Sequence, residues 1–244
     1  MRKYPSAPHP FVIEPRWEGP LALGEGGRLE LDLLLVGRAR SLAPFLVVAL
    51  DRATARGLGA GRARVQLVRV RQVNAAHSPT ERILYDAEGD AAIHPAEPAG
   101  LPPLLPTKGH YEVAFLTPTA LVRHGKAVER PDPSSLFRAL LRRVTNLAYF
   151  HADGLELPLD FRALTERADA LLDLGFRGRR EYWQRFSSRQ GRRVPMGGAV
   201  GTLRFKGELG PLAPFLALGG ELHVGRGTTF GLGRYRVRAL GSDP

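Results

Sequence analysis

Hydrophobic and polar residues alternate in two segments near the carboxyl end of the chain, with a short apolar stretch between them. Residues 200–206 and 235–238 have the period of two that is typical of half-buried strands, and residues 211–218 favour a short helix. From residue 110 the first predicted elements are a strand at 110–117 that ends at Pro118 and a helix that is capped by Ser134 or Ser135 and ends near His151. A second helix at 158–174, which begins near Asp160, follows them. Two strands at 176–189 and 200–207, joined by a basic turn at 190–193, then precede the short helix and the last strand.

The first part of the chain repeats only some of this order. The elements predicted there are an extended segment at 10–13, a strand at 28–37 with one face fully buried, a helix capped by Ser41 and ending at Gly57, a strand at 63–73, and a strand at 82–86 that pairs with it as a hairpin. The order from residue 110 is the βαββαβ order of a ferredoxin-like domain with a helical insertion. We therefore predict an α+β fold of tandem ferredoxin-like domains, the first of them incomplete.

The predicted domain boundaries follow composition. Residues 1–86 form the incomplete N-terminal domain, residues 87–108 are rich in Pro, Ala and Gly and form a linker, and residues 109–244 form the C-terminal domain. The open sheet face of such domains often binds RNA.

The balance of charge indicates what the protein binds. Lysine and arginine number 35 against 24 acidic residues, for a net charge of +11, and most of the excess is arginine. Such a surface binds polyanions, although high-GC genomes favour arginine in any case. Composition alone therefore leaves open whether the charge reflects nucleic-acid binding or genome composition.

Cysteine is absent, which excludes disulfides and thiolate metal sites. Neither a signal peptide nor a membrane-spanning apolar run is recognisable, so we expect a cytoplasmic protein without membrane contact.

Residues 224–233, which we call the glycine-rich loop, connect the short helix to the last strand with the sequence VGRGTTFGLG. Its glycines can adopt positive φ angles and allow another chain to approach closely, and its polar and basic side chains suit a phosphodiester. The residues predicted here to bind RNA are Gly225, Arg226, Gly227, Thr228, Thr229, Gly231, Gly233 and the following Arg234.

Basic residues also gather in the predicted hairpin at 177–206, where Tyr182, Trp183 and Phe186 lie between them. This mixture is typical of backbone neutralisation combined with base stacking, and the alternative interpretation is a solvated hairpin with Trp183 in the core. The residues predicted to bind RNA outside the loop are Arg179, Arg180, Arg192 and Arg193 of the hairpin and Arg142 and Arg143 of the long helix.

The residues of the tail identify a family resemblance. Residues 201–207 (GTLRFKG) and 218–235 (LGGELHVGRGTTFGLGRY) resemble the C-terminal signature of the CRISPR-associated RAMP endoribonucleases that process precursor CRISPR RNA. Residues 9–15, 57–59 and 115–119 are also similar to this family. The resemblance implies that the loop positions CRISPR repeat RNA, and that cleavage to mature crRNA needs no metal or cofactor. In that reaction the 2′-hydroxyl attacks the adjacent phosphate and leaves a 2′,3′-cyclic phosphate, usually with a histidine as acid or base.

Histidines are the candidates for that proton transfer. His223 precedes the loop, His151 ends the basic helix, and His124 lies in a basic turn. A structural role is open for each of them. In many relatives the catalytic histidine belongs to the opening strand and helix of the first domain, which we expect this chain to lack, so the resemblance leaves cleavage open while it implies RNA binding. The alternative function is therefore a noncatalytic crRNA-binding subunit that works with other CRISPR effector subunits. A plain metabolic enzyme is the third alternative. Acidic pairs such as Glu166 and Asp169 are typical of solvated helix faces, so no metal site is predicted.

Overall fold

The computed structural model describes residues 7–16, 22–59, 61–75, 78–187 and 191–241. The chain divides into two compact units, of which the larger contains Met1–Leu34 and Pro103–Pro244 and the smaller contains Leu35–Pro102. The N-terminal residues thus group with the C-terminal unit. The predicted boundaries after residues 86 and 108 stay a prediction.

The larger unit is built on a four-stranded antiparallel sheet. The sheet contains β5 (Lys108–Thr119), β8 (Leu172–Ser187), β9 (Arg192–Glu208) and β10 (Tyr235–Leu240), in the spatial order β10-β5-β9-β8. Helix α2 (Pro133–His151) follows β5, and α4 (Ala213–Leu222) follows β9 after a 3₁₀ turn, η2 (Gly210–Leu212). This connectivity and strand order are those of a βαββαβ unit, as the sequence predicted, with α3 (Phe161–Asp169) inserted before β8.

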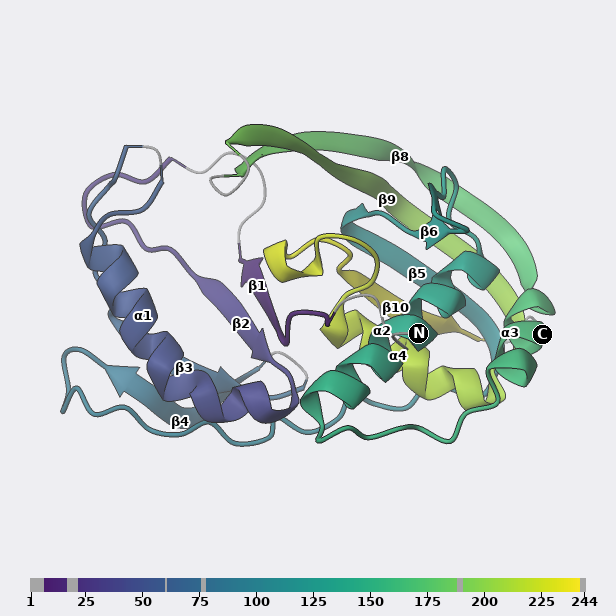
Figure 1. Ribbon diagram of the computed structural model, residues 1–244, viewed down its shortest axis with the longest axis horizontal. Coiled ribbons are helices and arrows are strands. Elements are labelled where there is room, and N and C mark those ends of the chain that lie inside the picture. Colours follow the sequence, from purple (N-terminus) through teal and green to yellow (C-terminus); the bar gives the residue numbers. More distant parts are fainter. Residues whose placement is uncertain (1–6, 17–21, 60, 76–77, 188–190, 242–244) are drawn as a thin grey trace. The chain divides into compact units, whose positions relative to one another are not determined.

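One face of this sheet and its two long helices enclose the core (Figure 1). Alternate residues of the strands point inward. Tyr111 and Val113 on β5 and Leu203 on β9 are examples, and these three side chains are fully buried. Leu136 and Leu140 fill the facing side of α2, where residues three and four apart share one face. The burial of these side chains fixes the register of the sheet, because a shift of one residue would turn every core residue to solvent.

Several element ends differ from the prediction for identifiable reasons. Asp132, not Ser134 or Ser135, caps α2: its carboxylate accepts from the Ser135 backbone N–H at 2.9 Å, and the Ser135 hydroxyl completes the capping box. Pro118 does not end β5, because the register of the strand is already irregular between Phe115 and Thr119. The predicted start of this helix near Asp160 is confirmed, and the Asp160 carboxylate caps α3 by accepting from the Ala163 N–H at 3.0 Å.

The β8–β9 hairpin is longer than predicted. Leu172 and Leu174 belong to β8 and not to the preceding helix, and Arg192 and Arg193 pair within β9 and do not lie in a turn. Residues 188–190, and the side chains of Trp183 and Phe186, lie outside the described part of the chain. A small additional hairpin of β6 (Val122–Arg123) and β7 (Lys126–Ala127) follows β5, where the sequence indicated only a turn.

The N-terminal strands of the larger unit form a separate two-stranded sheet of β1 (Phe11–Pro15) and β2 (Leu31–Leu35). An ion pair joins them, with Arg16 Nε 2.8 Å from Asp32 Oδ2, and this hydrogen bond raises the pKa of Arg16. The prediction that β2 has one fully buried face is wrong, since its residues are exposed or half-buried.

The smaller unit contains η1 (Gly37–Leu42), α1 (Ala43–Ala55), β3 (Arg69–Val73) and β4 (Pro79–Asp86). The predicted β3–β4 hairpin is confirmed. Ser41 does not cap α1, because its hydroxyl donates to the Arg38 carbonyl at 2.8 Å. Within the described residues the tandem ferredoxin-like arrangement stays a prediction, since the strands before residue 103 form two pairs and not one four-stranded sheet. No helix in the part of the chain described here is long and apolar enough to cross a membrane.

Candidate nucleic-acid interface

The glycine-rich loop is a compact turn closed by its own backbone. The Val224 N–H donates to the Gly233 carbonyl at 2.9 Å, and a 3₁₀ turn, η3 (Thr228–Phe230), lies between them. Gly233 has φ +77°, and a Cβ there would stand 1.8 Å from the Val224 carbonyl oxygen. At Gly225, with φ +91°, a Cβ would meet the Ala120 carbonyl oxygen at 2.6 Å. The close approach that the glycines allow is therefore that of the protein's own backbone, where the sequence suggested RNA.

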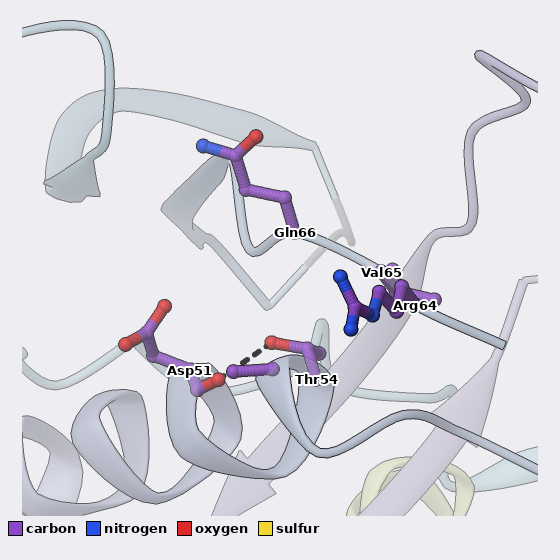
Figure 2. Close-up of a pocket in the computed structure, with 6 residues that line it drawn as sticks. Asp51, Thr54, Arg64, Val65 and Gln66 are labelled. Atoms are coloured by element: carbon purple, nitrogen blue, oxygen red, sulfur yellow. Dashed lines mark hydrogen bonds between the residues drawn. The ribbon is translucent and has the colours of Figure 1, made fainter. Parts of the chain in front are cut away.

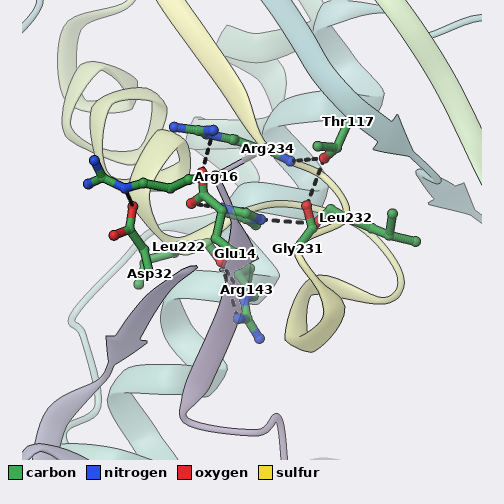
Figure 3. A network of polar contacts seen from close by, with 10 residues as sticks. Glu14, Arg16, Asp32, Thr117, Arg143, Leu222, Gly231, Leu232 and Arg234 are labelled. Atoms are coloured by element: carbon green, nitrogen blue, oxygen red, sulfur yellow. Dashed lines mark hydrogen bonds and ion pairs between the residues drawn. The ribbon is translucent and has the colours of Figure 1, made fainter. Parts of the chain in front are cut away.

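Glu14 of β1 lies beneath this loop and is buried. Its carboxylate forms an ion pair with Arg234 (Figure 3). Its Oε2 also stands 3.4 Å from His223 Nε2. The other ring nitrogen of His223, Nδ1, lies 3.1 Å from the Leu232 carbonyl oxygen. Both nitrogens of this candidate catalytic histidine thus contact the protein, and its side chain is buried.

Thr117 of β5 holds the loop from the other side (Figure 3). Its hydroxyl donates to the Gly231 carbonyl at 2.8 Å, and it accepts from the Arg234 backbone N–H at 2.9 Å. Of the loop residues predicted to bind RNA, Thr228, Gly231 and Gly233 are buried. Gly225, Gly227, Thr229 and Arg234 are half-buried, and Arg226 is the one exposed residue of this set.

A cavity of about 150 Å³ lies where the glycine-rich loop meets α2. Its lining residues are Pro8, Ala139, Arg142, Arg143, Asn146 and Gly225. Three predicted RNA-binding residues, from a helix and a loop far apart in sequence, therefore meet at one place. Two guanidinium groups and one amide supply hydrogen-bond donors that suit an anionic oxygen.

Arg143 is the more buried of the two arginines. Its Nε and Nη2 donate to the Leu222 carbonyl at 3.3 and 3.2 Å, which ties α2 to the end of α4. Burial lowers the pKa of Arg143 to about 10, because the charged form loses its hydration. The group therefore remains protonated at neutral pH, and in this partly desolvated place it attracts an anion more strongly than a fully hydrated arginine does.

His151 stands beside the same cavity. Its Nε2 lies 2.7 Å from the carbonyl oxygen of Pro8, a lining residue. Since a carbonyl only accepts, Nε2 carries a proton and the opposite nitrogen, Nδ1, is the one that can exchange a proton.

His124 is not part of this arrangement. It is exposed between β6 and β7 with φ +49°, and no hydrogen bond of its ring is found within the described residues.

The predicted arginines of the β8–β9 hairpin either contact other residues of the protein or lie exposed. Arg179 pairs with Glu181 at 2.5 Å. Arg180 donates to the Val128 carbonyl at 3.0 Å and lies 5.7 Å from the centre of the Tyr182 ring. Arg192 and Arg193 are exposed at the start of β9. None of these four residues lines the cavity.

Sequence reasoning missed Glu14, Thr117 and Asn146, which hold the loop or line the cavity. Glu14 is the one acidic residue among residues 9–15, and that isolated charge is the signal that could have identified it.

The smaller unit also has a cavity, of about 390 Å³, between the end of α1 and residues 64–66 (Figure 2). It is wide open, and none of the predicted site residues lines it. Among the described residues no group of three or more His, Asp or Glu side chains is placed to hold a metal ion.

Two family models match the chain. One, described as CRISPR-associated endoribonuclease Cas6, matches residues 113–235, which is a little more than half of the chain. The other, described as the AF_1859 N-terminal domain, matches residues 1–98. No curated protein sequence matches.

Solved structures are similar over nearly the whole chain. A Thermus thermophilus Cas6 in a product complex is 22% identical, with a TM-score of 0.57 over 97% of this chain and 84% of that chain. A second Cas6 product complex is 20% identical, with a TM-score of 0.52 over 96% of this chain and 84% of that chain. A partial Cas6-RT-Cas1–Cas2 complex is 14% identical, with a TM-score of 0.52 over 94% of this chain and 39% of that chain. At these identities the likeness shows a common fold.

Proposed function

The chain belongs to the family of CRISPR-associated Cas6 endoribonucleases, and on that premise we propose that it binds CRISPR repeat RNA and cleaves it without a metal ion to give mature crRNA. The family's description as an endoribonuclease supports RNA as the substrate class, and two solved Cas6 structures of similar fold are product complexes. The proposal rests mainly on one observation, the cavity between α2 and the glycine-rich loop, where Arg142, Arg143 and Gly225 meet.

This cavity suits a phosphodiester in charge and has room for more than one water molecule. Its volume of about 150 Å³ exceeds that of a single water, whose share of liquid volume is about 30 Å³. Arg142 is exposed at the mouth and can meet an incoming phosphate, while Arg143 supplies a charge with little hydration to lose. Arg226, exposed on the adjacent loop, can bind a neighbouring phosphate.

The proposed reaction is an internal transesterification. The 2′-oxygen loses its proton and attacks the adjacent phosphorus, the bond from phosphorus to the 5′-oxygen breaks, and that oxygen takes up a proton. The products are a 2′,3′-cyclic phosphate and a 5′-hydroxyl, so no water or cofactor is consumed. Positive charge beside the phosphate stabilises the transition state, where negative charge accumulates.

We assign the proton transfer to His151 among the three candidate histidines. Its Nε2 contacts the carbonyl of Pro8, which lines the cavity, and its Nδ1 is the nitrogen available to exchange a proton. His223 is assigned a positioning role, because both of its ring nitrogens contact the protein beneath the loop. His124 is assigned no role in the cavity.

The decisive experiment incubates the purified protein with end-labelled repeat RNA in excess EDTA. We expect cleavage at one site, with a cyclic phosphate that resists phosphatase until acid opens it. Cleavage that EDTA abolishes would contradict the metal-independent mechanism.

The same assay tests the alternative of a noncatalytic crRNA-binding subunit. The engagement of both His223 nitrogens favours this alternative. It predicts tight binding of the repeat RNA with no product at any time. The partial Cas6-RT-Cas1–Cas2 complex of similar fold supports adding partner subunits to that incubation.

A further inference from the structure

A cluster of cations on the solvent face of the four-stranded sheet lies apart from the proposed site. Core residues alternate with outward residues along these strands, so Arg204 lies on the face opposite to Leu203, and Arg236 on the face opposite to Tyr235. We call this set the sheet-face cluster, and its cations are Arg177, Arg179, Arg204, Lys206, Arg236 and Arg238.

The register of the strands arranges these cations around small side chains. Arg236 of β10 pairs with Ala114 of β5, Ala114 pairs with Thr202 of β9, and Thr202 pairs with Arg177 of β8. Arg177 and Arg236 are both exposed, and three strand spacings, about 14 Å, separate their backbones. The centre of this row is therefore flat and carries no charge, while each end carries an arginine.

Glu112 organises the neighbouring row. Its Oε2 accepts from Arg204 Nε at 2.8 Å and Nη2 at 2.6 Å, and its Oε1 accepts from Arg238 Nη2 at 2.5 Å. The Glu112 side chain is only 9% exposed, whereas those of Arg204 and Arg238 are 53% and 71% exposed. Each arginine has five N–H donors, so the buried carboxylate fixes both guanidinium groups in place and leaves donors for a ligand in solvent.

From this arrangement we infer that the sheet face binds a single-stranded segment of RNA, separately from the cavity beside α2. The inference rests on the proposed function for the identity of the polymer. Phosphates pair with the arginines of the two rows, and guanidinium planes stack on bases. A single strand fits better than a duplex, because an exposed sheet offers a flat surface on which splayed bases can lie over Ala114 and Thr202.

The test uses the full chain with the double substitution Arg177→Ala and Arg236→Ala. Neither residue takes part in the Glu112 ion pairs. The matched control is Arg162→Ala with Arg52→Ala, two exposed helix arginines outside the cluster. The probe is a labelled 15-nucleotide oligo(U), and its Kd is measured between 50 and 300 mM KCl, with thermal melting to verify that both variants fold.

We expect the double variant to bind oligo(U) about 10-fold more weakly at 100 mM KCl, with a salt slope smaller by about 1.4, since single strands contribute about 0.7 for each lost phosphate contact. The control should match the wild type. Unchanged affinity and slope in a folded double variant would overturn the inference, as would wild-type protein that does not bind oligo(U). Failure of the wild type to cleave repeat RNA, while oligo(U) binding still depends on the cluster, would overturn the proposed function alone.

Discussion

Glu14 and Arg234 form an ion pair that joins the first strand of the protein to the end of its glycine-rich loop. The carboxylate is 9% exposed and also faces His223 Nε2 at 3.4 Å. Because Arg234 further donates its backbone N–H to Thr117, the loop is held by β1 and β5 together. The segment that precedes the smaller unit in sequence thus determines the shape of a loop more than 200 residues later in the chain.

Substitution of Glu14 should therefore loosen the loop. Glu14→Gln keeps the shape of the side chain but removes the charge, which leaves the Arg234 guanidinium without its counter-charge in a largely buried place. We expect the free energy of unfolding to fall by about 1–3 kcal/mol. Urea denaturation measures it, with the exposed Glu30→Gln as control. Arg234→Gln alone should have a similar effect, and the double variant should lose less than the sum; strictly additive losses would show that the two residues do not interact.

The loop glycines give a second prediction. Gly233→Ala places a Cβ 1.8 Å from the Val224 carbonyl oxygen at φ +77°, so the closing hydrogen bond between these residues must break. The backbone conformation alone costs about 1–2 kcal/mol. We expect a clear loss of thermal stability together with weaker RNA binding. Gly241→Ala is the matched control, because its Cβ would meet nothing within 4 Å. A Gly233→Ala variant as stable as the wild type would show that the loop can adopt another shape.

How far the sequence predicts this architecture depends on whether the deciding interaction is local. The period of two along residues 200–206 and the helical pattern of α2 predicted their elements correctly, because each needs only one buried face. The end of β5 was predicted wrongly, because the rule that proline ends a strand ignores what the partner strand requires. Pro118 lies where pairing is irregular, and its carbonyl accepts from Gly233 N–H.

The candidate site was predicted only in part, because the chemistry of a residue is visible in the local sequence while its tertiary contacts are not. Arg142, Arg143 and Gly225 were identified by their chemistry, although nothing in the local pattern indicates that they line one cavity. Glu14 was missed, because its contacts with His223 and Arg234 exist only after β1 packs beneath the loop.

Arg143 offers a test of the cavity. Arg143→Met removes the charge and keeps most of the apolar volume, so repeat RNA should bind about 10-fold more weakly, and the salt slope should fall by about 0.7–0.9. Arg143→Lys keeps the charge but loses the two-nitrogen contact with the Leu222 carbonyl. Its affinity for repeat RNA should therefore lie between those of the wild type and Arg143→Met. Filter binding at several KCl concentrations measures both variants. If Arg143→Met binds like the wild type, the cavity does not hold a phosphate.

His151 gives the corresponding test of catalysis. His151→Gln retains an N–H that can donate to the Pro8 carbonyl but cannot exchange a proton near neutral pH. We expect the single-turnover cleavage rate to fall about 10²–10⁴-fold while the Kd for repeat RNA changes little. His94→Gln, at an exposed loop position, serves as the control and should cleave normally. An equal loss of binding and cleavage would instead assign His151 a structural role.

Glu112 predicts how stability depends on pH. Hydrogen bonds from Arg238 and then Arg204 lower the pKa of Glu112 from its usual 4.5. Since the folded-state pKa lies below the unfolded value, the carboxylate contributes stability above pH 4.5 and loses it as pH falls through the lowered pKa. The wild type should therefore be more stable than Glu112→Gln by a constant amount between pH 5 and 7, and this difference should shrink below pH 4.5. Urea denaturation at each pH measures the difference, and the exposed Glu88→Gln should show none. A difference that stays constant down to pH 3 would mean that the arginines do not stabilise the charged form of Glu112.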